Sequence, residues 1–361
     1  MTTPTSSNMV ASAGSAGTAR TVAGAGVSVA GTSAAGSGGM LASSAGMSAA
    51  ASGGGGMSGN LAGAAGSSGP DATCPMAAVM PGAEHEFMIN SKNGLMYSYI
   101  LRVPMGVDVT QRTPLLIHWH ALGSSPEEAR MVTSIDAKVD AANWLVVYPR
   151  SPDKSWDVGS CCTATVGGQS RYEEVFAREL IADIQTKACV DTKRIYTNGF
   201  SNGGMISQFL ACKMTDVFAA SAPMGSTLTI DQAMCSPSRA IPIFMINGTA
   251  DPLVGYNTPG LAGGISVPDD VKFWADKNKC TGDPETFVMM GKATCKRYTS
   301  CGSGVEVSSC AVDGMGHCVP GMKKESPTNC LTKDGIALGM PNDDIDGLQM
   351  DMDFLKRFTL P

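Results

Sequence analysis

The chain has 361 residues, a formal net charge of −6 and a pI near 5.3. An acidic chain without a basic cluster lacks the Lys and Arg residues that nucleic-acid phosphates attract, so nucleic acid is excluded as a partner. The chain also contains no apolar run of about 18 residues or more, and it therefore predicts no transmembrane helix.

The N-terminal segment, residues 1–73, differs in composition from the rest of the chain. It consists mostly of Ala, Gly, Ser, Thr and Met, and its only charged residues are Arg20 and Asp71. Such a segment cannot bury enough side-chain area to offset the entropy lost on folding. We therefore expect residues 1–73 to be a disordered Gly/Ala/Ser-rich linker and residues 74–361 to form one domain.

All twelve cysteines lie between Cys74 and Cys330, within the predicted domain. An even, high number of cysteines favours disulfides and an oxidising compartment, which indicates a secreted or cell-surface protein. No basic region followed by an apolar core is visible at the start of the chain. We expect an export signal that is missing here or unusual, with the linker as a tether to a membrane anchor. The alternative is a cytosolic protein with buried free thiols.

Beyond Cys74 the chain alternates between strand and helix patterns. Asn93-Gly94 favours a hairpin turn, and Ser125, Pro126 and Glu128 form the starting signal of a helix. This alternation predicts an α/β fold with a mostly parallel sheet covered by helices on both faces. The expected strands are Glu84–Asn90, Leu95–Val103, Leu115–His120, Trp144–Tyr148, Arg194–Thr197, Phe218–Pro223, Ile241–Ile246, Thr294–Thr299 and Val305–Val312. The expected helices are Pro126–Ala142, Glu173–Lys187, Gly204–Leu210, Asp269–Asn278 and Leu348–Phe358.

The pentapeptide Gly199-Phe200-Ser201-Asn202-Gly203 lies between a predicted strand and a predicted helix. This is the context of a G-x-S-x-G nucleophile elbow, in which the serine stands at a sharp turn and is exposed. The helix N-terminus also offers backbone N–H groups to a developing oxyanion. Ser201 is thus the candidate nucleophile; the alternative is an ordinary helix N-cap.

A serine nucleophile needs a histidine base, and four histidines are available. His85, His118 and His120 precede the elbow, and the last two belong to a buried strand where a packed histidine is expected. His317 follows a strand in a glycine-containing loop. We therefore predict His317 as the base.

The acid should lie between the nucleophile and the base in sequence. Asp251 follows the strand ending near Ile246, whereas Asp269 and Asp270 suit the first turn of a helix. We predict Asp251 as the acid and keep Asp313 as the alternative. For the oxyanion hole we predict the backbone N–H groups of Asn202 and Leu122.

The chain contains five motifs in order: His120-Ala121, Trp156-Asp157-Val158-Gly159-Ser160-Cys161-Cys162, Gly199–Met205, Asn247-Gly248-Thr249-Ala250-Asp251-Pro252, and Gly316-His317 with Pro320-Gly321. With these motifs and the residues assigned above, the chain resembles the secreted poly(3-hydroxybutyrate) depolymerase-like esterases, which include feruloyl and acetylxylan esterases. The resemblance covers about residues 85–321. It implies an α/β-hydrolase fold, hydrolysis of plant cell-wall or polyester-derived esters through an acyl-enzyme, no cofactor and no metal, and a substrate-binding role for Trp156.

Three alternatives to a cell-wall esterase remain open. The first is a polyester depolymerase, and the second is a non-catalytic surface-binding module on a tether. The third is a metal-binding protein built on the stretch from Cys280 to Cys330, which lacks the C-x-x-C pair of a zinc site.

One disulfide can be predicted from strand register. A two-residue turn at Gly302-Ser303 would place Cys295 directly opposite Cys310 on the two strands that flank it. Directly opposed strand residues have Cα atoms about 4.5 to 5.5 Å apart, which is within disulfide range. The alternatives pair Cys295 with Cys280 or Cys301.

Overall fold

The computed structural model describes residues 74–75, 78–162, 173–323, 330, 332–333 and 336–361. The predicted linker, residues 1–73, lies outside the described residues.

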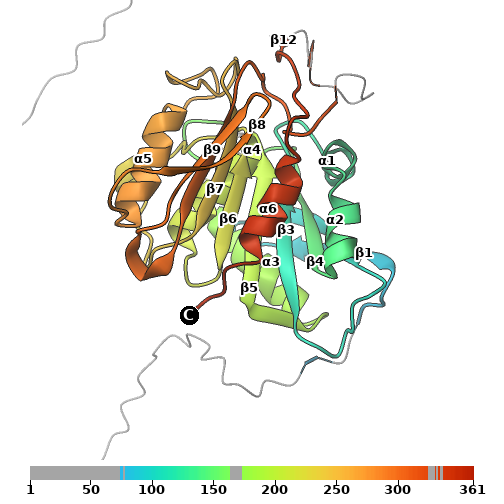
Figure 1. Ribbon diagram of the computed structural model, residues 1–361. Helices are drawn as coiled ribbons and strands as arrows, with labels where there is room; N and C mark the ends of the chain where they lie inside the picture. The colour runs from blue at the N-terminus through green and yellow to red at the C-terminus, as the bar shows by residue number, and fades with distance from the viewer. Residues whose placement is uncertain (1–73, 76–77, 163–172, 324–329, 331, 334–335) are drawn as a thin grey trace, which may run out of the picture. The chain divides into compact units, whose positions relative to one another are not determined.

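The main sheet has ten strands in the order β1-β2-β4-β3-β5-β6-β7-β10-β9-β8 (Figure 1). The six strands from β4 to β10 in this order are parallel, and an antiparallel pair flanks them on each side. The strands are β1 (Ala83–Asn90), β2 (Met96–Val103), β3 (Thr113–Trp119), β4 (Leu145–Arg150), β5 (Val190–Phe200), β6 (Ala220–Met224), β7 (Ile243–Gly248), β8 (Glu285–Met290), β9 (Ala293–Tyr298) and β10 (Val307–Val312). A separate two-stranded sheet pairs β11 (Thr332–Lys333) with β12 (Ile336–Ala337).

Helices cover both faces of the sheet. The helices are α1 (Pro126–Thr133), α2 (Ile135–Ala142), α3 (Glu173–Gln185), α4 (Asn202–Lys213), α5 (Val267–Lys277) and α6 (Gly347–Leu355). One hydrophobic cluster joins the sheet to α3, α4 and α5, and a second joins the opposite face to α2 and α6. Figure 1 shows α6 lying in front of the central strands. Among the described residues, no helix has the length and apolar composition that crossing a bilayer requires.

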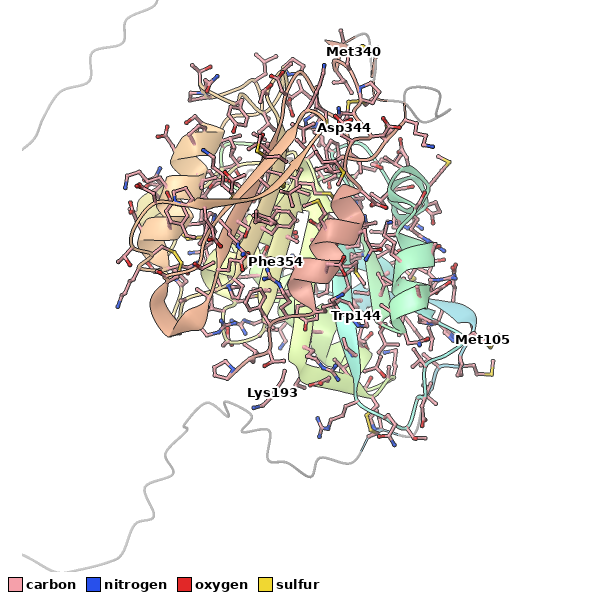
Figure 2. The ribbon with its side chains drawn as sticks, in the orientation of Figure 1. Met105, Trp144, Lys193, Met340, Asp344 and Phe354 are labelled. Carbon is pink, nitrogen blue, oxygen red and sulfur yellow. A yellow bond between two sulfur atoms is a disulfide. The ribbon has the colours of Figure 1, made fainter. Side chains whose placement is uncertain are left out.

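Alternation along β3 explains why the sequence of this strand is almost continuously apolar. Leu115 and Ile117 face the α3–α4 cluster, whereas Leu116 faces the α2–α6 cluster, and all three are fully buried. On the second face lies Phe354 of α6, which is labelled in Figure 2. Its ring packs against Phe244 of β7, with centroids 5.4 Å apart. A central strand buried on both faces is what positions the residues at its carboxyl end.

The helix predicted over Pro126–Ala142 is two helices in the structure. Ser134 separates α1 from α2 and has φ 52° and ψ 32°, the left-handed conformation that commonly ends a helix. Its backbone N–H donates to the carbonyl of Arg130. The start was predicted correctly, because Ser125 accepts from the N–H of Glu128 and Pro126 is the first helical residue.

All twelve cysteines are paired in disulfides. The Cys295–Cys310 bond joins β9 to β10 at directly opposed positions. The predicted two-residue turn is wrong, since β9 ends at Tyr298, β10 begins at Val307, and a 3₁₀ turn lies between them. The predicted register nevertheless holds, because Tyr298 lies opposite Val307 and Cys295 lies opposite Cys310. The other five bonds are Cys74–Cys189, Cys161–Cys162, Cys212–Cys235, Cys280–Cys301 and Cys318–Cys330.

Asp270 carries a buried carboxyl group on α5. It accepts a hydrogen bond from Nε2 of Gln208 at 2.8 Å, and its Oδ1 has no partner among the described residues. Burial raises the pKa of Asp270 to about 7. Because an unfolded Asp has a pKa of about 3.9, the folded state binds the proton more tightly. This stabilisation is complete below pH about 4 and is lost as the pH rises through about 7.

Replacing Asp270 with Asn should therefore flatten the dependence of stability on pH. Between pH 5 and pH 8 the wild type should lose about 3 kcal/mol of unfolding free energy that Asp270→Asn keeps. Urea unfolding at the two pH values measures this difference, and Asp283→Asn, which changes an exposed carboxylate, is the matched control. Parallel pH profiles for wild type and Asp270→Asn would contradict the assignment.

Candidate active site

Ser201 lies at the sharp turn between the end of β5 and the start of α4. Its φ of 58° and ψ of −123° lie in a region that residues other than glycine rarely adopt. Two hydrogen bonds hold it there: its N–H donates to Met224 of β6 at 3.0 Å, and its carbonyl accepts from Met205 at 2.9 Å. This strained turn exposes the side chain at the carboxyl edge of the sheet, as in a nucleophile elbow.

The two outer glycines of the pentapeptide are required by close backbone contacts. A Cβ on Gly199 would lie 2.6 Å from the carbonyl oxygen of Gly203. A Cβ on Gly203 would overlap the carbonyl oxygen of Trp119 at the end of β3. Side chains at these positions would separate α4 from the sheet, so the glycines allow the tight strand–helix turn that positions Ser201.

Ser201, His317 and Asp251 form a continuous chain of hydrogen bonds. Nε2 of His317 lies 2.8 Å from Oγ of Ser201, and Nδ1 lies 2.7 Å from Oδ2 of Asp251. A carboxylate facing Nδ1 fixes the tautomer that is protonated there, so Nε2 is free to accept the serine proton. The structure thus brings together three residues that come from the ends of three different strands.

Neighbouring contacts fix Asp251 and His317 in this arrangement. Oδ1 of Asp251 accepts from the N–H groups of Leu253 and Val254, both at 2.8 Å. The N–H of His317 donates to the carbonyl of Leu338 at 2.6 Å, and its ring packs against Phe200 with centroids 4.7 Å apart. Only Oδ2 of the Asp251 carboxylate is therefore left to face the imidazole.

The alternative acid and the two buried histidines have other hydrogen-bond partners. Oδ1 of Asp313 accepts from the hydroxyl of Thr249. The ring of His118 is buried against Asn198 in β5, and burial lowers the pKa of His118 to about 4. Burial likewise lowers the pKa of His120 to about 4, as expected for histidines packed beside a central strand.

A cleft of about 600 Å³ opens over Ser201 and His317. Much of its wall is apolar, and Leu122 and Met131 keep 47% and 61% of their surface exposed there. A second cleft of about 690 Å³, lined by residues such as Arg178 and Arg239, contains none of the predicted site residues. We place the site in the first cleft because it contains the hydrogen-bonded serine.

One predicted oxyanion donor directly follows Ser201, and the other lines the same cleft. Asn202 is the first residue of α4, and Leu122 belongs to the β3–α1 loop in the wall of the cleft. The donation of their N–H groups to an oxyanion stays a prediction.

The side chain of Asn202 has a role that the sequence did not reveal. Its Oδ1 accepts from the N–H of Trp156 at 2.8 Å, and its Nδ2 donates to the Trp156 carbonyl at 3.0 Å. The residue after Ser201 therefore fixes the backbone of the segment that follows β4.

The predicted substrate-binding role of Trp156 is wrong. This side chain has no exposed surface, and its Nε1 donates to the carbonyl of His120 at 2.9 Å. Its ring packs edge-on against Trp119 at a centroid distance of 4.9 Å. Trp156 therefore packs under the start of the β3–α1 loop, where it holds the carbonyl of His120. Because the ring is fully buried, it does not face the cleft.

The known proteins to which this chain is similar include esterases. No protein-family model matches the chain. The chain is 32% identical over 283 residues to a feruloyl esterase B of Piromyces equi, which covers 73% of this chain and 45% of that protein. It is 24% identical over 217 residues to a bifunctional acetylxylan esterase/xylanase of Neocallimastix patriciarum, which covers 58% of this chain and 29% of that protein. The chain thus spans less than half the length of these two relatives.

A solved structure shows the same fold. The acetyl xylan esterase from Aspergillus awamori matches with a TM-score of 0.52 at 14% identity, over 66% of this chain and 95% of that one. Together with the parallel strands and the helices on both faces, this likeness confirms the α/β-hydrolase fold predicted from the sequence.

Proposed function

This chain resembles the feruloyl and acetylxylan esterase group of α/β-hydrolases, and on that premise we propose that it is a serine esterase. It hydrolyses carboxylic esters through an acyl-enzyme. The observation that carries the proposal is the chain of hydrogen bonds from Asp251 through His317 to Ser201, at the floor of a partly apolar cleft.

In the first half of the reaction Ser201 is acylated. Oγ of Ser201 attacks the ester carbonyl carbon while Nε2 of His317 takes its proton. Asp251 stabilises the imidazolium that forms, and the N–H groups of Asn202 and Leu122 stabilise the oxyanion. His317 then protonates the leaving alcohol as the C–O bond breaks, which leaves the acyl group on Ser201.

In the second half water takes the place of the alcohol. His317 removes a proton from this water, which attacks the acyl carbonyl, and the tetrahedral intermediate collapses to release the acid. The proton returns to Oγ of Ser201. Both halves use only side chains and backbone N–H groups of this chain, so the proposed reaction includes no cofactor.

We propose esters of the plant cell wall as the substrates, since the two relatives bear the names feruloyl esterase and acetylxylan esterase. The six disulfides support secretion, because such bonds persist in oxidising compartments. Residues 1–73 would then tether the domain to a cell surface, a proposal carried by their composition.

Incubation of the purified chain with three substrates tests the function. Feruloylated arabinoxylan, acetylated xylan and poly(3-hydroxybutyrate) film are assayed for released ferulate, acetate and 3-hydroxybutyrate. We expect ferulate or acetate, whereas release of 3-hydroxybutyrate alone would identify a polyester depolymerase. A fluorophosphonate probe, located by peptide mapping, should label Ser201. No product together with no labelled serine would overturn the proposal.

A further inference from the structure

Two consecutive cysteines lie in the cleft beside the proposed nucleophile. Cys161 and Cys162 are joined by a disulfide, and both line the same cleft as Ser201 and His317. Neither residue takes part in the acyl transfer described above. The bond closes a small ring around the intervening peptide, and Cys162 has a φ of 64°, which residues other than glycine rarely adopt.

The segment that carries this ring is fixed relative to the nucleophile. At its start the Asn202 amide clamps the backbone of Trp156 with two hydrogen bonds. Nearer the ring, the N–H and the hydroxyl of Ser160 both donate to the carbonyl of Thr229 at 3.0 Å. The hydroxyl of Ser160 also accepts from the N–H of Gly264 at 3.3 Å. These bonds anchor the residue directly before the ring, and the Asn202 amide ties the same segment to the turn that carries Ser201.

The chemistry of the ring suits an apolar partner. A disulfide has no strong hydrogen-bonding group, and divalent sulfur makes favourable contacts with aromatic rings. Other residues of the cleft extend this apolar character, among them Leu122, Met131 and Val319. A rigid, apolar wall of this kind favours a flat, apolar group over a small one, because burying the larger group removes more area from water.

We propose that the Cys161–Cys162 ring is a specificity-determining wall of the cleft that contacts an aromatic acyl group of the ester. The inference rests on the serine esterase function proposed above. It assigns the ring to substrate contact, not to bracing of the fold. Loss of the ring should therefore raise KM for an ester with an aromatic acyl group. It should change the kinetics of an ester with a small acyl group much less.

The test compares two methyl esters that share an alcohol, methyl cinnamate and methyl butanoate. The variant is Cys161→Ala with Cys162→Ala. The control is Cys280→Ala with Cys301→Ala, which removes a disulfide whose residues do not line this cleft. We expect the cleft variant to lose about 10-fold in kcat/KM for the cinnamate through KM, with butanoate little changed, as for loss of an apolar pocket contact. The control should leave both esters unchanged.

The measured quantity is kcat/KM for methyl cinnamate divided by kcat/KM for methyl butanoate, both determined on one preparation. This ratio does not depend on the fraction of folded enzyme. An unchanged ratio in the cleft variant, with wild type active on both esters, would overturn the inference and leave the proposed function standing. A wild type inactive on both esters would instead overturn the function. If the alanine pair does not fold, Cys161→Ser with Cys162→Ser replaces it. Because serine is more polar than alanine, this pair should lower the cinnamate-to-butanoate ratio at least as far.

Discussion

Ser201→Ala should abolish ester hydrolysis while leaving the fold intact. Loss of a triad serine costs on the order of 10⁶ in kcat in other enzymes. The substitution removes only the Oγ that faces Nε2 of His317 in the cleft, so it creates no cavity in the core. Alanine must also adopt the strained backbone of this position, as serine already does. The initial rate on methyl butanoate measures the effect.

Thermal unfolding and near-UV circular dichroism are the controls for this variant, and both should match the wild type. A Ser201→Ala enzyme that kept a tenth of the wild-type rate would show that another group attacks the ester. A loss of rate accompanied by unfolding would instead place Ser201 among residues needed for structure.

Asp251→Asn should lower kcat by about 10⁴ through a change of the histidine tautomer, as in other triads. Oδ1 of Asp251 accepts two backbone N–H groups, from Leu253 and Val254. In the variant the amide oxygen must take that position, so the amide NH₂ turns toward Nδ1 of His317. Nδ1 then has to accept, the proton moves to Nε2, and the imidazole can no longer take the proton of Ser201.

Two measurements separate this effect from a loss of packing. Asp313→Asn is the matched control, and it should retain nearly full activity because Asp313 contacts Thr249. In Asp251→Asn, proton NMR should show the imidazole proton on Nε2. Greater damage from Asp313→Asn than from Asp251→Asn would transfer the role of the acid to Asp313.

The hydrogen-bonded residues of the candidate site could be predicted where they depend on local pattern and chain order. The glycines around Ser201 mark the elbow because close backbone contacts exclude a side chain there. Asp251 and His317 follow from their order and from their places just after strands. The apolar runs of the central strands likewise identify the sheet, since burial on both faces demands such runs.

Other features depend on tertiary contacts that the local sequence does not encode. The motif containing Trp156 indicates proximity to the site, but only packing against Trp119 shows that this ring is buried. The break at Ser134 lies within a continuous helical pattern and is visible only in its backbone angles. Cysteine number indicates disulfides, yet the pairing of Cys161 with its neighbour cannot be deduced from counting.

The Cys74–Cys189 bond has a mechanical consequence. Cys74 lies at the start of the described domain, and Cys189 directly precedes β5, the strand that ends at Ser201. The β1–β2 hairpin at the sheet edge lies between them in sequence. A pulling force applied upstream of Cys74 passes through the disulfide into the central strand and bypasses the hairpin. A domain held by its N-terminal segment against flow would thus bear the load on β5, a central strand paired with β3 and β6. Unfolding would then require both neighbouring strands to be sheared at once, while the edge hairpin stays unloaded.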